Sequence, residues 1–239
     1  RTPLAVIKGT MEVLIRKPRE KQEYEDKINF CITEVDRLNN LVDQLLLLAR
    51  FENQKQNIRN EQVYLNSLIL DTIARFSEKI KEKKIIIAAN FKEDYYIKSD
   101  TYLVSIIFSN IISNAIKYSN NNGRIVINLG NESGKIICSV SDNGIGISSE
   151  DLDKIFNSFY RSDVSNHPEI KGTGLGLSIV KRLCNLLSIE LDVKSIKEEG
   201  TKVNLRISQF HFSQHARCLL EFLQRRSRRH AFPRQDRYR

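Results

Sequence analysis

Hydrophobic positions at the start of the chain recur at helical spacing and stop at Pro18. They are Leu4, Ile7, Met11 and Leu14, and they predict a helix over residues 4–17. A second series alternates steps of three and four residues and predicts a longer helix over residues 22–53. Its members are Ile28, Cys31, Val35, Leu38, Val42, Leu45 and Ala49.

Two helices joined by a short charged turn form an antiparallel hairpin. The second series is a heptad seam, which Ile32, Leu41 and Leu48 widen. A hairpin alone cannot bury so broad an apolar face. Two solutions are open: a second copy completes a dimeric four-helix bundle, which the regular seam favours, or the rest of this chain covers the face.

The polar stretch at residues 52–62 has almost no hydrophobic side chains and is typical of a linker. Beyond it, strands and helices are mixed without strict alternation, which predicts an α+β fold with helices on one face of a sheet. Asp100 is the predicted N-cap of one of these helices, and GNESG between two strands predicts a hairpin turn. Strands are predicted near 62–66, 85–90, 95–98, 123–129, 135–141, 190–195 and 201–208, and helices near 67–83, 101–119 and 174–188.

The net charge of +9 is concentrated at the C-terminal end. Residues 210–239 hold eight Arg and no Lys, against two acidic residues. This tail is interpreted as a disordered extension or as foreign sequence, and the binding of nucleic acid or anionic lipid is the less favoured alternative.

The composition also indicates the cellular compartment in which this chain is expected. The four cysteines are scattered without metal-ligand spacing, so reduced thiols in a cytosolic setting are expected. No apolar run reaches the roughly 18 residues that span a bilayer, and no signal peptide opens the chain. Any membrane anchor is therefore expected upstream of residue 1.

Polar side chains follow one stripe of the predicted helix 101–119. Asn110, Asn114 and Lys117 are spaced four and three residues apart, next to an apolar stripe. An amide oxygen suits Mg²⁺ and an ammonium group suits a phosphate. The alternative is that the amides bond neighbouring backbone groups, and the residues alone do not separate these two interpretations.

Two glycine-containing loops accompany this stripe. In SDNGIGI, Asp142 ends a strand where it could accept a hydrogen bond from an exocyclic amine, although an Asx turn is the alternative. In KGTGLGLSIVKRL, a glycine-rich loop runs directly into a helix, which predicts an anion site. The spacing fits neither a Walker A motif nor a dinucleotide-binding fingerprint.

The order of the motifs is more specific than any one of them. N-x-x-x-N-A-x-K-Y-S, D-N-G-I-G, F-x-x-F-Y-R and G-T-G-L-G-L follow one another within residues 61–209. This order resembles the ATP-binding domain of sensor histidine kinases, in the superfamily of gyrase, Hsp90 and MutL. The resemblance implies a left-handed α/β sandwich (a Bergerat-type fold) that binds ATP beneath a mobile lid at residues 148–171.

The resemblance also implies residue roles. Asn114 matches the Mg²⁺ ligand, Asn110 lines the phosphate site, and Lys117 and Arg161 meet the phosphates. Asp142 matches the carboxylate that reads adenine, with Thr201 supporting it through water. The remaining nucleotide-binding positions are Tyr118, Gly144, Gly146, Ile147, Gly172, Thr173, Gly174, Leu175, Gly176 and Leu177.

Two further positions refine the expected activity. ATP-hydrolysing members of the superfamily carry a Glu where this chain has Asn110, and an amide cannot act as a base, so phosphoryl transfer to a side chain is favoured over hydrolysis. RTPL at the start resembles the second half of the phosphoacceptor box, which puts the accepting His three residues before Arg1. Thr2 matches a position that orients water for dephosphorylation of a partner regulator. This chain is therefore expected to bind ATP without labelling itself.

Together these features predict the cytoplasmic core of a dimeric sensor histidine kinase, which passes the γ-phosphoryl group of Mg-ATP to a His and then to an Asp of a response regulator. The expected division is a hairpin at 1–53, a linker at 54–61, an ATP-binding domain at 62–209 and a basic tail at 210–239. Nucleic acid is an expected partner of the tail at most. The alternative is an ATP-gated clamp of the gyrase, Hsp90 or MutL type, which Asn110 and the hairpin disfavour.

Overall fold

The computed structural model describes residues 2–53, 58–162, 170 and 172–208. The basic tail and part of the predicted lid (residues 163–169 and 171) lie outside the described residues, so the predictions made for them are not addressed by the fold. In the described part, no helix combines the length and the apolar character that crossing a bilayer requires.

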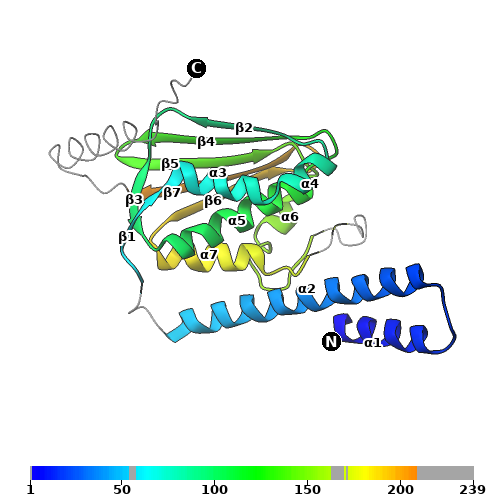
Figure 1. Cartoon of the computed structure of the whole chain (residues 1–239). Helices are drawn as coiled ribbons and strands as arrows, with labels where there is room; N and C mark the ends of the chain where they lie inside the picture. Colours follow the sequence, from blue (N-terminus) through cyan, green and yellow to red (C-terminus); the bar gives the residue numbers. More distant parts are fainter. Residues whose placement is uncertain (1, 54–57, 163–169, 171, 209–239) are drawn as a thin grey trace, which may run out of the picture.

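The N-terminal region is an antiparallel helical hairpin, as predicted (Figure 1). Its helices are α1 (Thr2–Ile15) and α2 (Lys21–Asn53), and Pro18 lies in the turn between them. Part of the predicted heptad seam is open to solvent, because Val35 is 43% and Val42 is 51% exposed. The described part of the chain therefore leaves these two seam positions partly uncovered.

Two sheets form the second region, where a single sheet was expected. β1 (Glu61–Tyr64) pairs antiparallel with β3 (Tyr96–Ser99) as a two-stranded ribbon. The main sheet has the order β2-β4-β5-β7-β6, in which only the β2–β4 pair is parallel. Its strands are β2 (Ile86–Phe91), β4 (Arg124–Glu132), β5 (Lys135–Asp142), β6 (Glu190–Ile196) and β7 (Gly200–Ser208).

The helices of this region cover one face of the main sheet, which confirms the predicted α+β arrangement (Figure 1). They are α3 (Leu65–Arg75), α4 (Ser77–Glu82), α5 (Thr101–Tyr118), α6 (Ser149–Leu152) and α7 (Gly176–Leu186). The prediction of one helix over 67–83 was wrong. The chain leaves helical geometry at Phe76 (φ −102°, ψ 12°), whose side chain packs against the core and separates α3 from α4.

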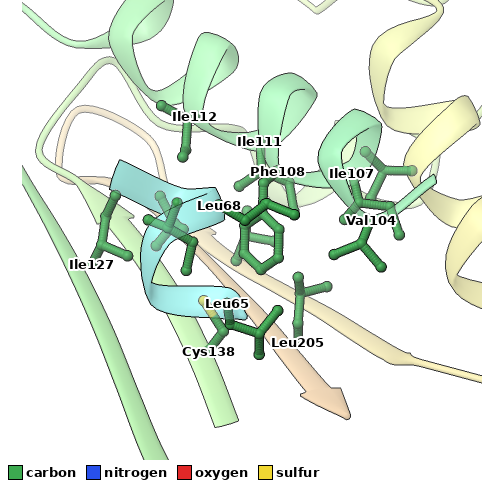
Figure 2. Close-up of a cluster of buried hydrophobic side chains, with 14 of the residues drawn as sticks. Leu65, Leu68, Val104, Ile107, Phe108, Ile111, Ile112, Ile127, Cys138 and Leu205 are labelled. Carbon is green, nitrogen blue, oxygen red and sulfur yellow. The ribbon is translucent and has the colours of Figure 1, made fainter. Parts of the chain in front are cut away.

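The core lies between these helices and the sheet. Figure 2 shows Phe108 and Ile112 of α5 among Leu65 and Leu68 of α3 and Ile127 of β4. The apolar stripe of α5 is almost fully buried because the helix packs on α3, α7 and β5. Burial of one stripe fixes the rotation of α5, and therefore the direction in which its polar stripe points.

Local signals hold α5 and the β4–β5 hairpin in place. The Asp100 carboxylate accepts a hydrogen bond of 3.1 Å from the Leu103 N–H, which confirms the predicted N-cap. The predicted hairpin turn is also confirmed, with Ser133 (φ 50°) and Gly134 (φ 77°) between the paired residues Glu132 and Lys135.

Candidate functional site

A cavity of about 1010 Å³ opens between the C-terminal half of α5, the loop after β5 and helix α2. Almost every described residue singled out in the sequence lines it. These are Asn110, Asn114, Lys117, Tyr118, Asp142, Gly146, Ile147, Arg161, Gly172, Thr173, Gly174, Gly176, Leu177 and Thr201. Segments far apart in the sequence therefore meet at one place, as the motif order predicts.

Helix α5 supplies the polar stripe of the cavity wall. The Asn110 side-chain amide donates a hydrogen bond of 2.9 Å to the carbonyl of Ile106 on the preceding turn. Its Oδ1 lies against the start of α7, since a Cβ added to Gly176 would be only 2.8 Å from it. The Asn110 amide therefore bonds a neighbouring backbone group, which was one of the two interpretations of the sequence. The residue also lines the cavity.

Lys117 reaches from α5 toward the glycine-rich segment. A Cβ added to Gly172 would lie 2.6 Å from its Nζ, which also stands 5.7 Å from the centre of the Tyr118 ring. Burial raises the pKa of Tyr118, and the nearby guanidinium of Arg161 acts in the opposite direction. Two cations thus share this end of the cavity with a tyrosine.

Asp142 ends β5 at the wall of the cavity, where it pairs with Thr201 of β7. Its carboxylate accepts a hydrogen bond of 3.0 Å from the Gly144 N–H, so the Asx turn is present. Burial raises the pKa of Asp142 to about 6, and the backbone N–H groups of Gly144 and Thr201 oppose this rise. A half-buried acceptor of this kind suits a ligand that brings its own donor.

The loop after Asp142 is clamped between α5 and the β6–β7 hairpin. The Ile145 N–H donates to the carbonyl of Tyr118 at 3.1 Å, and the Glu198 N–H donates to the carbonyl of Ile145 at 2.7 Å. An added Cβ would lie 2.2 Å from the Tyr118 oxygen at Gly144 and 1.9 Å from the Ile196 oxygen at Gly146. Both glycines are therefore required by the protein's own backbone, in addition to the nucleotide-binding role that the resemblance implies.

The glycine-rich segment leads into α7 as predicted, although the helix begins at Gly176. The N-cap residue, Leu175, makes no side-chain capping hydrogen bond, and it is fully buried. The Thr173 hydroxyl accepts from the Leu175 N–H at 3.2 Å and lies 3.3 Å from Oε1 of Gln44 on α2. This contact ties the loop to the helical hairpin, which the sequence did not indicate.

Residues of the predicted lid are held by a carboxylate that the sequence analysis missed. Asp151 accepts hydrogen bonds from the hydroxyls of Tyr160 (2.5 Å) and Ser162, and these bonds lower its pKa to about 2. Arg161, between the two, donates to the carbonyl of Ile170 at 2.5 Å. No local pattern distinguishes Asp151 from other acidic loop residues, because its partners are nine and eleven residues away.

Helix α2 closes the open side of the cavity with polar side chains, also missed by the sequence analysis. Thr33, Asp36 and Gln44 line this side.

Thr2 begins α1, and its side chain lies outside the described part of the chain. Across the described residues no group of three or more His, Cys, Asp or Glu side chains could hold a metal ion. Asn114, which the resemblance names as the Mg²⁺ ligand, lines the cavity, and its amide oxygen suits a hard cation.

The two regions match two known families of domains. Residues 1–54 match the family described as His Kinase A (phospho-acceptor) domain, and residues 99–210 match the family described as histidine kinase-, DNA gyrase B-, and HSP90-like ATPase. The chain belongs to the sensor histidine kinases. The phosphoacceptor match supports the kinase over the ATP-gated clamp, since it accounts for the hairpin.

A curated relative agrees with this family assignment. The sensor histidine kinase WalK of Bacillus subtilis is 30% identical over 211 residues, which cover 87% of this chain and 34% of WalK. The chain thus spans about a third of that relative.

Solved structures share the kinase fold. ThkA in complex with the response regulator protein TrrA matches with a TM-score of 0.71 at 23% identity, over 88% of this chain and 58% of that one. Full-length ShkA in complex with AMPPNP matches with a TM-score of 0.70 at 23% identity, over 89% of this chain and 44% of that one.

Proposed function

We propose that this chain binds Mg-ATP in the cavity between α5 and α7 and transfers the γ-phosphoryl group to a histidine of the helical hairpin, from which it passes to an Asp of a response regulator. The observation that carries the proposal is the convergence of Asn110, Asn114 and Lys117 with Asp142 and the start of α7 around one cavity. The AMPPNP complex of ShkA and the regulator complex of ThkA support the same assignment.

In this proposal the two ends of the cavity bind different parts of the nucleotide. The Asp142 carboxylate accepts a hydrogen bond from the amino group of adenine. The phosphates lie toward Lys117, Arg161 and the first turn of α7, whose N–H groups favour an anion. Asn114 holds Mg²⁺, which neutralises charge on the phosphates when bound. The residues therefore position the nucleotide and offset its charge, which is most of what phosphoryl transfer requires.

Asn110 favours transfer to a side chain over hydrolysis. Its amide donates to the Ile106 carbonyl and offers no group that can remove a proton from water. A histidine on the hairpin is a better acceptor, because a neutral imidazole nitrogen attacks without an external base. Residues 1–53 contain no histidine, so the accepting residue is expected ahead of Arg1, as the resemblance implies.

The hairpin supports a homodimer in this proposal. Several large apolar side chains on its two helices are exposed, and a second hairpin would bury them in a four-helix bundle. They include Leu4, Met11, Ile28, Ile32, Val35, Val42, Leu45 and Leu46. The regulator would dock on this bundle, where Thr2 would orient water for dephosphorylation. The domain limits of 53, 62 and 209 and the location in the cytoplasmic part of a membrane-anchored sensor stay predictions of the sequence.

The test compares this chain with a version that carries a helical extension ending in His-Glu-Leu ahead of Arg1. Both are incubated with Mg²⁺ and ATP labelled on the γ-phosphate. We expect acid-labile, alkali-stable label on the extended chain only. The label should disappear when the added His is changed to Ala, and also in Asn114→Ala.

Two outcomes would contradict the proposal. One is rapid steady-state ATP hydrolysis that depends on Asn114 and not on the added His, which would favour the clamp. The other is label on the unextended chain that survives acid.

A further inference from the structure

The hydroxyl of Ser195, on β6, is the centre of a hydrogen-bond network that joins three parts of the cavity wall. It donates to the carbonyl of Gly200 at 2.8 Å and accepts from the Ile147 N–H at 2.8 Å. It also lies 2.8 Å from the hydroxyl of Thr201. Ile147 ends the loop that follows Asp142, and Thr201 pairs with Asp142 across the sheet. Ser195 therefore connects the loop after Asp142 with the β6–β7 hairpin.

The number of protons decides the direction of the Ser195–Thr201 bond. A serine hydroxyl has one proton and two lone pairs. A carbonyl can only accept, so the Ser195 proton is directed at Gly200. A backbone N–H can only donate, so it occupies one lone pair. The remaining lone pair of Ser195 is left for Thr201, whose hydroxyl must then be the donor.

This direction fixes what Thr201 offers to a ligand. Once its proton is directed at Ser195, the Thr201 oxygen acts toward the cavity only as an acceptor. The neighbouring Asp142 carboxylate is an acceptor as well when ionised. Both polar groups at this end of the cavity therefore favour a base edge that carries a donor, such as the 6-amino group of adenine. They disfavour a base with a 6-oxo group, such as hypoxanthine.

We propose that Ser195 is a positioning residue for base selection. The Ser195 oxygen accepts the hydrogen bond of the Thr201 hydroxyl, and this orientation makes the Asp142 end of the cavity select a 6-amino purine. The inference rests on the proposed nucleotide site and adds a residue and a selectivity to it. Without the Ser195 oxygen, the Thr201 hydroxyl is able to rotate and to donate to a 6-oxo group. Removing the Ser195 hydroxyl should therefore change mainly the preference for a 6-amino over a 6-oxo purine nucleotide.

The experiment measures binding of Mg-ATP and Mg-ITP to the whole chain by isothermal titration calorimetry. The wild type should prefer ATP. Ser195→Ala should reduce the ATP-to-ITP affinity ratio by roughly fivefold to tenfold, the value of one net hydrogen bond. Ser195→Thr, which keeps the hydroxyl, should retain the wild-type ratio. Ser208→Ala, an exposed serine of the same β6–β7 hairpin, is the matched control.

Different outcomes separate the two levels of the argument. If the wild type binds neither nucleotide, the proposed function fails and the inference fails with it. If the wild type prefers ATP and Ser195→Ala keeps the same ratio, only the inference is overturned. Should Ser195→Ala fail to fold, Thr201→Val takes its place. It removes the oriented acceptor and should lower the ratio, whereas an unchanged ratio would again overturn the inference.

Discussion

The ammonium group of Lys83 donates a hydrogen bond of 2.7 Å to the main-chain carbonyl of Lys117. It also donates to the carbonyls of Ser119 at 2.9 Å and Ile116 at 3.2 Å. Lys83 thus places a positive charge on the C-terminal end of α5, where helix carbonyls lack partners and the helix dipole is negative. The last turn of the helix that carries Lys117 and Tyr118 is fixed from outside the helix.

Replacing Lys83 should therefore loosen the wall of the site. We expect Lys83→Met to lower the free energy of unfolding by about 1–3 kcal/mol, because three carbonyls lose a charged donor. Nucleotide binding should weaken as well. Lys81→Met, at an exposed position of α4, is the control and should change neither property. Urea denaturation and calorimetry measure the two effects, and a Lys83 variant as stable as the control would contradict this role.

Lys84, the next residue, is expected to reduce stability through its backbone conformation. It adopts φ 53°, in the left-handed region that a side chain disfavours. Lys84→Gly should relieve this cost and stabilise the protein by about 0.5–1 kcal/mol. Lys92→Gly, an exposed loop position that is not among the positive-φ residues of the described chain, should give no such gain. Equal changes in the two variants, measured by denaturant unfolding, would show that φ at Lys84 is not the cause.

Gly146 should tolerate no side chain. It combines φ 64° with an added Cβ only 1.9 Å from the Ile196 carbonyl oxygen, so Gly146→Ala must displace the loop from the β6–β7 hairpin. We expect a loss of about 2 kcal/mol or more in unfolding free energy, together with weaker nucleotide binding. Gly130→Ala is the matched control, because no atom stands within 4 Å of its added Cβ. The same stability in both variants would refute the close approach.

The Asp142 carboxyl gives a dependence on pH. Its pKa is raised to about 6 from an ordinary value of 3.8. If the carboxylate accepts from the base, ATP affinity should fall as the pH drops through about 6 and the group becomes protonated. Calorimetric titrations between pH 5 and 8 measure this, with Asp142→Asn expected to bind weakly and with a flatter profile. A wild-type affinity that stays constant through pH 6 would contradict the assignment.

The Asp142 carboxyl affects folding stability in the opposite direction: low pH should weaken ATP binding but favour the folded state. Because folding raises its pKa, its contribution to stability is fully present below about pH 3.8 and is lost as the pH rises through about 6. Asp142→Asn carries no charge to bury, so it should be more stable than the wild type at pH 7. This advantage should shrink toward pH 4. Unfolding curves at the two pH values test it, and an advantage that grew at low pH would reverse the sign argued here.

The exposed seam of α2 predicts the oligomeric state. Val35→Glu together with Val42→Glu should convert a dimer into a monomer, since four carboxylates would be buried in a two-fold bundle. Lys27→Glu, at an exposed position of the same helix, is the control and should stay dimeric. Sedimentation velocity distinguishes the two states. A wild-type chain that is monomeric at high concentration would exclude the bundle.

Much of the fold followed from local signals. The periodicity of the first 53 residues, the Asp100 cap and the GNESG turn each act within a few residues, so they could be predicted from spacing alone. The break between α3 and α4 could not be predicted, because Phe76 turns toward a core that other segments build. The separate β1–β3 ribbon escaped prediction for the same reason, since strand pairing is decided by distant partners.

The sequence by itself determined which residues could bind a nucleotide, because the residue types and their order along the chain carry that chemistry. Only the tertiary structure decided which groups hold them. Lys83 bonds a helix end more than thirty residues away, Ser195 bonds Ile147 across the loop, and Gln44 meets Thr173 from the other domain. Each of these contacts is made by an ordinary polar residue without a local pattern. Its role arises only when folding places a particular backbone or hydroxyl group within about 3 Å of it.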